Sequence, residues 1–327
     1  MALKMLPIEK VAAVYCALTC VLMVVMMPRL VDPVGMLLMR LEWLALTLAV
    51  ILAHHLTAKY FHPSSFFTLH SSFFTFLRVL AQVAWLAIWY PDTYEFNRTL
   101  NNLDHWFAAA DQSLFSCQPA IVFSQALPGA VWSEAFNLGY WSYFPMIGAL
   151  LIAIYIKEWR ARVDFKAFRL VSATILTAFF LYYVIYIFLP VVGPQFYFQA
   201  VGIDEILQGH FPALGTYFSS HTEMLPAPGW SDGLFSRLVG MAHEAGERPT
   251  AAFPSSHIGI STIVMVLTYR HAPKLLPYLI PLWALLCCAT VYIQAHYVVD
   301  AIAGLLSAPV MLWIASRATH RFFPLNE

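Results

Sequence analysis

Long apolar runs separated by polar stretches constrain this sequence more than any other feature. Such runs approach the length of about 20 residues that an α-helix needs to cross a bilayer. They cover Val11–Met27, Leu41–Leu56, Phe73–Tyr90, Tyr140–Ile156, Leu170–Leu189, Ser256–Tyr269, Leu275–Ile293 and His296–Ile314. Of the 327 residues, 60% are hydrophobic and only 11% are charged. The sequence therefore predicts an all-α integral membrane protein, a polytopic bundle of about eight transmembrane helices, with the first two added to a six-helix core.

The remaining composition excludes several classes of protein. The formal net charge is +0 and no long basic block occurs, so we expect no nucleic-acid partner. Four of the five cysteines lie in apolar runs and none forms a CxxC pair, so no disulfide framework is expected. The first apolar run is too long for a signal-peptide core and lacks a small-residue cleavage site, which predicts a retained helix.

Basic residues predict the orientation of the helices. The most basic connection contains Lys157, Arg160 and Arg162, and positive charge marks cytoplasmic loops. Further Lys and Arg residues near both ends of the chain agree with it. We therefore expect both termini to be cytoplasmic and the loops of the other side to face the periplasm, a lumen or the exterior.

Two long non-spanning regions fall on that outer side. Residues 92–139 mix aromatic and polar residues, which is typical of amphipathic helices lying in the interface. Val191–Phe253 is rich in Pro and Gly, and a loop of this length is more often functional than idle. We expect residues 1–91 to form N-terminal transmembrane helices. Residues 92–327 are expected to form a catalytic core, whose loop 191–256 acts as a lid or headgroup-binding region.

The segment Phe253-Pro254-Ser255-Ser256-His257 marks the end of that loop. Pro followed by Ser is a helix-start signal, because Ser is a good N-cap and Pro suits the first turn. A helix N-terminus presents free N–H groups and a partial positive charge, which suit a phosphate. His257 in the first turn would add a proton donor beside such an anion.

His296 and Asp300 form the second candidate pair. A spacing of four places them on one helix face, where the carboxylate can hold the imidazole in one tautomer. Such a pair also arises by chance or as a structural hydrogen bond. Ionisable residues within a membrane are costly, however, and are usually functional.

The two motifs together favour phosphoryl transfer. A nucleophilic histidine held by an acid, with a second histidine as proton donor, meets the needs of that reaction. The phosphate oxygens also need cations or N–H groups. Arg248 is favoured over Arg237 for this role because it lies closest to the Pro254–His257 turn.

These motifs resemble the type-2 phosphatidic acid phosphatase superfamily, and within it the branch of inositol phosphorylceramide synthases. The second motif of the family, usually Pro-Ser-Gly-His, stands here as Pro-Ser-Ser-His, and the third is His296-x-x-x-Asp300 followed by Gly304. The resemblance extends upstream through Glu134, Asn137, Tyr140, Tyr143, Pro145 and Gly193-Pro194. It implies a phosphatase-type six-helix core and no metal or other cofactor.

The resemblance also implies roles for individual residues. His296 would be the nucleophile that forms a phosphohistidine, oriented by Asp300, and His257 would protonate the leaving alkoxide. Ser255 would hold a phosphate oxygen, and Ser256 and Arg248 are further candidates for phosphate binding. The substrate would be a lipid phosphate or phospholipid, with an alcohol or lipid as a possible acceptor.

The sequence departs from the family pattern where cations are expected. Thr290 occupies the position of the usual third-motif Arg, and Met241 stands where the first-motif Lys would be, although Arg248-Pro249 fits the end of that motif. The synthase branch commonly lacks the third-motif Arg as well. Which cations replace them is open.

Several alternatives remain at this point. Attack by water would make the protein a phosphatase and attack by an alcohol a transferase, and the sequence favours neither. A zinc enzyme could use His210, His221, His243, Glu244, His296 and Asp300, although no HExxH-like spacing occurs. A non-enzymatic transporter or channel with a His/Asp relay is the third alternative. The oligomeric state is open.

Overall fold

The computed structural model describes residues 4–60 and 65–322, and these fold into helices with no β-strand among them. The α-helices are α1 (Pro7–Met26), α2 (Pro33–Tyr60), α3 (Ser65–Ala84), α4 (Leu86–Asn97), α5 (Asp104–Phe115), α6 (Pro119–Ala126), α7 (Ala130–Trp141), α8 (Tyr143–Ala161), α9 (Lys166–Phe188), α10 (Pro194–Val201), α11 (Ile203–Leu207), α12 (Leu234–Gly246), α13 (Ser256–His271), α14 (Leu276–Tyr292) and α15 (Val298–Phe322). The all-α fold class is confirmed.

The predicted spans coincide with helices of the structure. Six helical segments of the described chain are long and apolar enough to cross a membrane, or seven if the bent pair α7 and α8 is one span. That pair bends by 47° between Trp141 and Tyr143. Helix α13 contains only 16 residues, which makes it shorter than a typical span. The protein is therefore an integral membrane protein, and the side that each loop faces stays a prediction.

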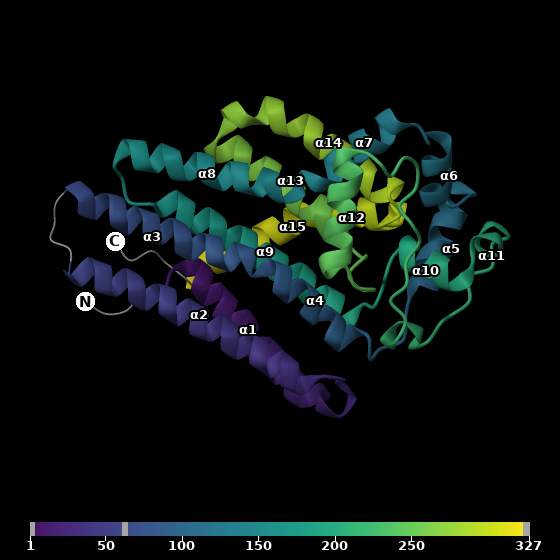
Figure 1. Ribbon diagram of the computed structural model, residues 1–327, viewed down its shortest axis with the longest axis horizontal. Coiled ribbons are helices and arrows are strands. Elements are labelled where there is room, and N and C mark those ends of the chain that lie inside the picture. The colour runs from purple at the N-terminus through teal and green to yellow at the C-terminus, as the bar shows by residue number, and fades with distance from the viewer. Residues whose placement is uncertain (1–3, 61–64, 323–327) are drawn as a thin grey trace. The chain divides into compact units, whose positions relative to one another are not determined.

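The chain divides into two compact units. The first comprises residues 1–92, 151–180 and 312–327, and the second comprises residues 93–150 and 181–311. In the first unit, α1, α2 and α3 pack side by side (Figure 1). Two buried ion pairs join its helices. Arg78 binds Glu9 through two hydrogen bonds, and Arg40 binds Asp92 through two more.

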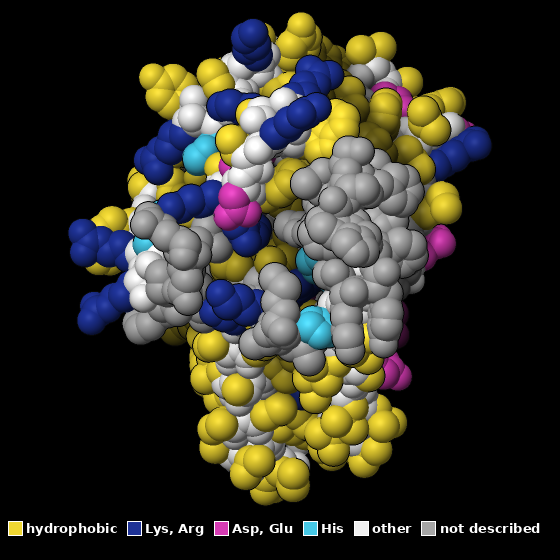
Figure 2. All heavy atoms as spheres, turned by 90° about the vertical axis from the view of Figure 1, so that its left-hand side faces the viewer, with side chains coloured by type: hydrophobic (Ala, Val, Ile, Leu, Met, Phe, Trp, Pro, Cys, Tyr) yellow, Lys and Arg dark blue, Asp and Glu magenta, His cyan; other side chains and the backbone are white. Residues whose placement is uncertain are grey.

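Helices α1 and α2 expose apolar side chains rather than polar ones. On α1, Val21 and Val25 are 60% and 72% exposed, and on α2 Val34 is 66% exposed. Figure 2 shows hydrophobic side chains covering its lower part, where these two helices lie. A continuous apolar surface of this kind is unfavourable in water but suits contact with lipid tails.

The second unit is built around α14. This helix packs against α7, α13 and α6, and α12 packs against α7 (Figure 1). A separate hydrophobic cluster of this unit contains Val191, Phe196, Tyr197 and Phe198, which surround the buried Tyr297. The cluster fixes the start of α10 against the turn that precedes α15.

The two regions that the sequence predicts not to span the membrane are largely folded. Residues 92–139, for which the sequence predicts amphipathic helices, form the end of α4 and the helices α5, α6 and most of α7. The long region Val191–Phe253 contains α10, α11 and α12. Apolar residues of this region, such as Ile206 and Phe218, are buried in the cluster described above. Their burial explains why it is a structured part of the second unit.

Candidate active site

The first motif begins helix α13. Ser255 is its N-cap, and the Ser255 hydroxyl accepts a hydrogen bond from the backbone N–H of Ile258 at 3.5 Å. The N–H of Ser256 donates to the Tyr186 hydroxyl, which in turn donates to the Pro254 carbonyl, each at 2.9 Å. In the described structure the backbone N–H of His257 has no hydrogen-bond partner. The predicted helix start is confirmed, and it keeps one donor for a ligand.

The two predicted catalytic histidines lie together. His296 Nδ1 is 2.8 Å from the Ala252 carbonyl oxygen, and His296 Nε2 is 3.5 Å from His257 Nδ1. Because a carbonyl oxygen can only accept, His296 Nδ1 must carry the proton and donate it. The lone pair of His296 is therefore on Nε2, the nitrogen that faces His257.

Asp300 lies close to His296 but does not form the predicted hydrogen bond. Its Oδ2 atom is 3.6 Å from His296 Nδ1 and instead accepts from the backbone N–H of Tyr297 at 3.0 Å. The spacing argument fails locally because α15 begins only at Val298, so His296 precedes the helix. The Ala252 carbonyl occupies the position expected for the carboxylate.

The surroundings of His296 keep its imidazole neutral. The residue is only 3% exposed, and burial lowers the pKa of His296 to about 4, although the Ala252 carbonyl and Glu247 act in the opposite direction. Burial penalises the charged form of an imidazole. A neutral ring with a free Nε2 lone pair is the form that a nucleophile requires.

His257 lies between two tyrosines. Its ring centroid is 4.6 Å from that of Tyr140, with nearly parallel planes, and 4.6 Å from that of Tyr143. Both tyrosines belong to the upstream positions that resemble the family. The rings fix one face of the imidazole and restrict the directions in which His257 can move.

Backbone contacts join the two motifs. The N–H of Ser255 donates to the Asp300 carbonyl at 3.1 Å. A Cβ atom on Gly304 would collide with the backbone carbonyl of Ser255, so a side chain at this position would push the helices apart. Gly304 therefore allows α15 to approach the start of α13 closely enough to bring His257 and His296 together.

Two buried aspartates, which the sequence analysis missed, hold the turn that carries His296. Asp111 accepts from the N–H groups of Val298 and Val299 at 2.9 and 3.0 Å. It thereby caps the first turn of α15. Burial raises the pKa of Asp111, and these two hydrogen bonds act in the opposite direction. The N–H of Tyr297 is bonded to Asp300, so the α15 N-terminus is occupied by carboxylates while that of α13 is not.

Asp104 holds the other side of this turn. It accepts from the N–H of Val192 at 2.7 Å, the N–H of Gly193 at 2.8 Å and the Tyr297 hydroxyl at 3.0 Å. Burial raises the pKa of Asp104 to about 7, against hydrogen bonds that favour the ionised form. Asp104 and Asp111 are seven residues apart, a spacing that places them on one face of α5. This repeat, among aromatic residues, is the signal that sequence reasoning could have used.

The backbone around His296 adopts left-handed conformations. Gly193 has φ = 90°, and a Cβ atom there would collide with the Ala295 carbonyl. Ala251 and Gln294 have φ values of 71° and 64°, which are unfavourable for residues with a side chain. These residues flank the carbonyl that holds His296 and the turn that carries it. Strain of this kind is concentrated at functional sites.

The predicted phosphate ligands are placed differently from one another. Ser255 and Ser256 lie at the start of α13 beside His257, and both are buried. Arg248 is exposed, and its described hydrogen bond goes to the Glu247 carbonyl rather than to the catalytic pair. Thr290, at the position of the missing third-motif Arg, accepts the N–H of His296 through its carbonyl at 3.0 Å.

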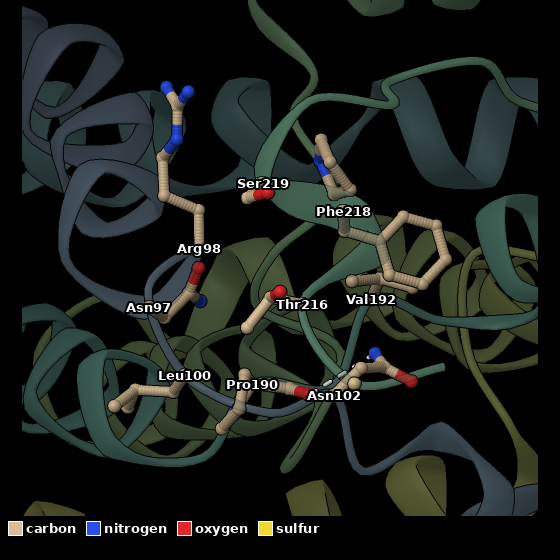
Figure 3. A pocket seen from close by; sticks show the side chains of 11 residues that line it. Asn97, Arg98, Leu100, Asn102, Pro190, Val192, Thr216, Phe218 and Ser219 are labelled. Atoms are coloured by element: carbon tan, nitrogen blue, oxygen red, sulfur yellow. Dashed lines mark hydrogen bonds between the residues drawn. The ribbon is translucent and has the colours of Figure 1, made fainter. Parts of the chain in front are cut away.

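A small surface pocket lies in the same unit, apart from the predicted site residues (Figure 3). It is lined by Asn97, Arg98, Leu100, Asn102, Pro190, Val192, Gly215, Thr216, Phe218, Ser219 and Pro249. Inside it the Asn102 side chain donates to the Pro190 carbonyl at 3.4 Å. None of the predicted catalytic residues lines this pocket.

The candidate zinc ligands are dispersed. His210 bonds to Glu205 at 2.8 Å, and His221 bonds to the Tyr217 carbonyl at 3.0 Å. In residues 4–60 and 65–322, no three His, Cys, Asp or Glu side chains are grouped as metal ligands would be. The structure therefore offers no donor set for the zinc alternative.

Comparison with protein families decides the class. A family model of the PAP2 superfamily matches residues 105–314, more than half of the chain and a range that includes both histidines. The chain belongs to the PAP2 superfamily. Members of the PAP2 superfamily are in general phosphatases and phosphotransferases that act on lipid phosphates, which places this membrane protein among lipid enzymes of that type. No curated protein and no solved structure matches the chain.

Proposed function

We propose that this PAP2 protein transfers a phosphoryl or phospho-headgroup group from a lipid phosphate or phosphodiester, through a phosphohistidine on His296, to an alcohol or to water. The observation that carries the proposal is the state of His296. Its Nδ1 proton is held by Ala252, so the Nε2 lone pair is directed at His257. This is the arrangement that a nucleophile beside a proton donor requires.

The first half-reaction forms the phosphohistidine. His296 Nε2 attacks phosphorus and the bond from phosphorus to the leaving oxygen breaks. His257, protonated on both ring nitrogens for this step, gives its Nδ1 proton to that oxygen and becomes neutral. Phosphorus must enter between the two ring nitrogens, which therefore separate from their 3.5 Å distance. The ring of His296 becomes positively charged, and Asp300, 3.6 Å from its Nδ1, stabilises that charge.

The second half-reaction reverses these proton movements. An acceptor hydroxyl gives its proton to His257 Nδ1, its oxygen bonds to phosphorus, and the bond from phosphorus to His296 breaks. Water as acceptor releases phosphate, and a lipid alcohol gives a new phospholipid, as in inositol phosphorylceramide synthases. The folded region Val191–Phe253 offers a surface for an acceptor, and both outcomes belong to the proposal.

The test is to trap the intermediate in purified full-length protein. The protein is incubated with a panel of lipid phosphates and phosphodiesters that carry ³²P, with and without an acceptor alcohol, and is then denatured. We expect protein-bound label that survives alkali and is lost in acid, as phosphohistidine is. Substitution of His296→Ala should abolish both label and turnover, while His257→Gln should slow the reaction.

The control for this experiment is His221→Ala, because His221 is exposed and bonds only locally. It should label as the unchanged protein does. Full turnover by a correctly inserted His296→Ala protein would contradict the mechanism. Free phosphate without acceptor would identify a phosphatase, and product that appears only with acceptor would identify a transferase.

A further inference from the structure

The proposed reaction needs a group that binds the phosphate oxygens, and the Lys and Arg of the usual motifs are missing. The described side chains whose charges act on His257 are His296 and His243, and neither is a lysine or an arginine. Arg248, which the sequence favours, is exposed and bonded to a backbone carbonyl. The N–H of His257 alone is one donor for several phosphate oxygens.

His243, which lies near His257, has a ring nitrogen without a hydrogen-bond partner in the described structure. The residue is only 9% exposed, and its Nε2 atom is buried with no hydrogen-bond partner in the described structure. Its ring meets the ring of Tyr140 edge-on at 5.9 Å, and Tyr140 in turn stacks on His257 at 4.6 Å. A buried polar atom without a partner is costly, so a ligand that pairs with it gains affinity.

The helix that carries His243 is fixed by polar contacts. Glu134 of α7 accepts from the N–H groups of Phe235 and Ser236 at 3.0 and 2.9 Å and from the Ser236 hydroxyl at 2.7 Å. Asn137, one turn further along α7, donates to the same hydroxyl at 3.2 Å. The start of α12 is thereby capped by α7, and His243 near its end is directed against Tyr140, two turns after Glu134.

We propose that His243 binds the phosphate group during the reaction, with its Nε2–H donating a hydrogen bond to a non-bridging phosphate oxygen. The inference rests on the proposed function and names a ligand for the same site. It assigns to α12 the phosphate-binding role that the Lys and Arg of the usual motifs would have. The ligand class is a phosphate monoester or diester, of which His243 touches only the oxygens.

The test measures phosphate binding without turnover. Orthovanadate and inorganic phosphate are titrated against the purified full-length protein, and dissociation constants are compared for His243→Leu and His243→Gln. Loss of a buried donor to an anion should weaken orthovanadate binding by roughly ten- to a hundredfold in His243→Leu. The Gln side chain places an N–H close to the position of Nε2, so His243→Gln should bind within about threefold of the unchanged protein.

Matched controls separate binding from folding. His221→Leu alters an exposed histidine of the same region and should leave orthovanadate binding unchanged. Thermal unfolding in detergent shows whether His243→Leu is folded, and His243→Gln tests the donor without a change in polarity. Orthovanadate binding by folded His243→Leu equal to that of the unchanged protein would overturn the inference, as would loss of binding in His243→Gln equal to that in His243→Leu.

The failure of this inference differs from failure of the proposed function. If His296 forms a phosphohistidine but orthovanadate binding does not depend on His243, only the role of His243 is overturned. Binding that depends on His243, in a protein that forms no phosphohistidine, overturns the mechanism and leaves the phosphate site standing.

Discussion

At the scale of single residues, the site depends on which group holds His296. A backbone carbonyl, that of Ala252, fixes the proton on Nδ1, and the Asp300 carboxyl lies 3.6 Å from Nδ1 without accepting that proton. A neutral carbonyl holds the tautomer without raising the basicity of the ring as strongly as a bonded carboxylate would. His296 therefore stays neutral over the physiological pH range.

This arrangement predicts the acid side of the pH profile. Since burial lowers the pKa of His296 to about 4, the nucleophile should lose activity only as the pH falls towards 4. A phosphodiester donor is the right substrate, because it does not titrate in this range. The burst of released alcohol should remain constant from about pH 7 to pH 5. An acid limb with a midpoint near 6.5, the ordinary value for histidine, would contradict it.

The same shift affects stability. The unfolded chain binds a proton at His296 near pH 6.5 and the folded chain only near pH 4. The contribution of the neutral His296 ring to the free energy of unfolding is therefore complete above about pH 6.5. It is lost progressively as the pH falls to about 4. Thermal unfolding in detergent should show this loss, and His296→Gln should show less of it.

Sequence reasoning selects candidate reacting residues but misses the groups that hold them. That His257, His296 and Asp300 lie close together was predictable from their types and spacing, while their catalytic roles stay predictions. The role of Ala252 was not, because a backbone carbonyl is present at every residue and only the fold decides which one is near.

At the scale of elements, the start of α15 is the critical junction. Two carboxyl groups accept hydrogen bonds from the N–H groups at this start. Asp111 accepts from Val298 and Val299, and Asp300 accepts from Tyr297. Carboxylates there also compensate the helix dipole. The N-terminus of α13 keeps the free N–H of His257, so the two helices that meet at the site have different tasks. The first turn of α15 is fixed beside His296, and the start of α13 keeps an N–H donor without a partner in the described structure.

Removing the charge at Asp111 should disturb this junction. Asp111→Asn keeps the size of the side chain but can accept from only one N–H group while its own amide faces the other. We expect a loss of about 1 to 3 kcal/mol of stability and a fall in kcat greater than the change in KM, because His296 shifts.

Steady-state kinetics and thermal unfolding in detergent measure the two effects. Asp232→Asn, at an exposed position of the outer loop, is the control and should have neither. An Asp111→Asn protein with unchanged kcat would show that the cap does not position the nucleophile.

The elements themselves were predictable in part. Every predicted span falls largely on helix, because hydropathy is summed over many residues and tolerates local error. Phe73–Tyr90 is divided between α3 and α4, and Tyr140–Ile156 crosses the bend between α7 and α8. Short helices of the outer regions, such as α10 and α11, are held by burial of residues like Phe198 and Ile206 against distant segments. No local pattern reveals that burial, so the region Val191–Phe253 was read only as a loop.

At the scale of the whole molecule, buried ion pairs organise the first unit. Arg78 and Glu9 are 5% and 1% exposed, and Arg78 also donates to the Lys4 carbonyl at 2.8 Å. The partners are 69 residues apart in the chain, so neither predicts the other. Polar contacts of this kind hold transmembrane helices together where lipid removes the hydrophobic driving force.

A double-mutant cycle tests this pair. Arg78→Met alone leaves a buried carboxylate without its partner and should cost about 3 to 5 kcal/mol, whereas Glu9→Gln combined with Arg78→Met should recover much of that loss. Thermal unfolding in detergent gives the comparison.

The ion pair of Arg169 with the exposed Asp164 provides the control for this cycle. Its Asp164→Asn variant should lose less than about 1 kcal/mol, since the Asp164 side chain is 75% exposed. Additive effects of the two substitutions at Glu9 and Arg78 would exclude a coupling between them.

The bonds that hold the turn of His296 also set an order of events during synthesis. Asp104 reaches Tyr297 across 193 residues, and Asp111 reaches Val298 across 187. The chain emerges from the ribosome in sequence, so these aspartates wait through the insertion of every intervening helix before they meet their partners. Until α15 has been made, the turn that carries His296 lacks these partners, and an incomplete chain cannot hold His296 beside His257.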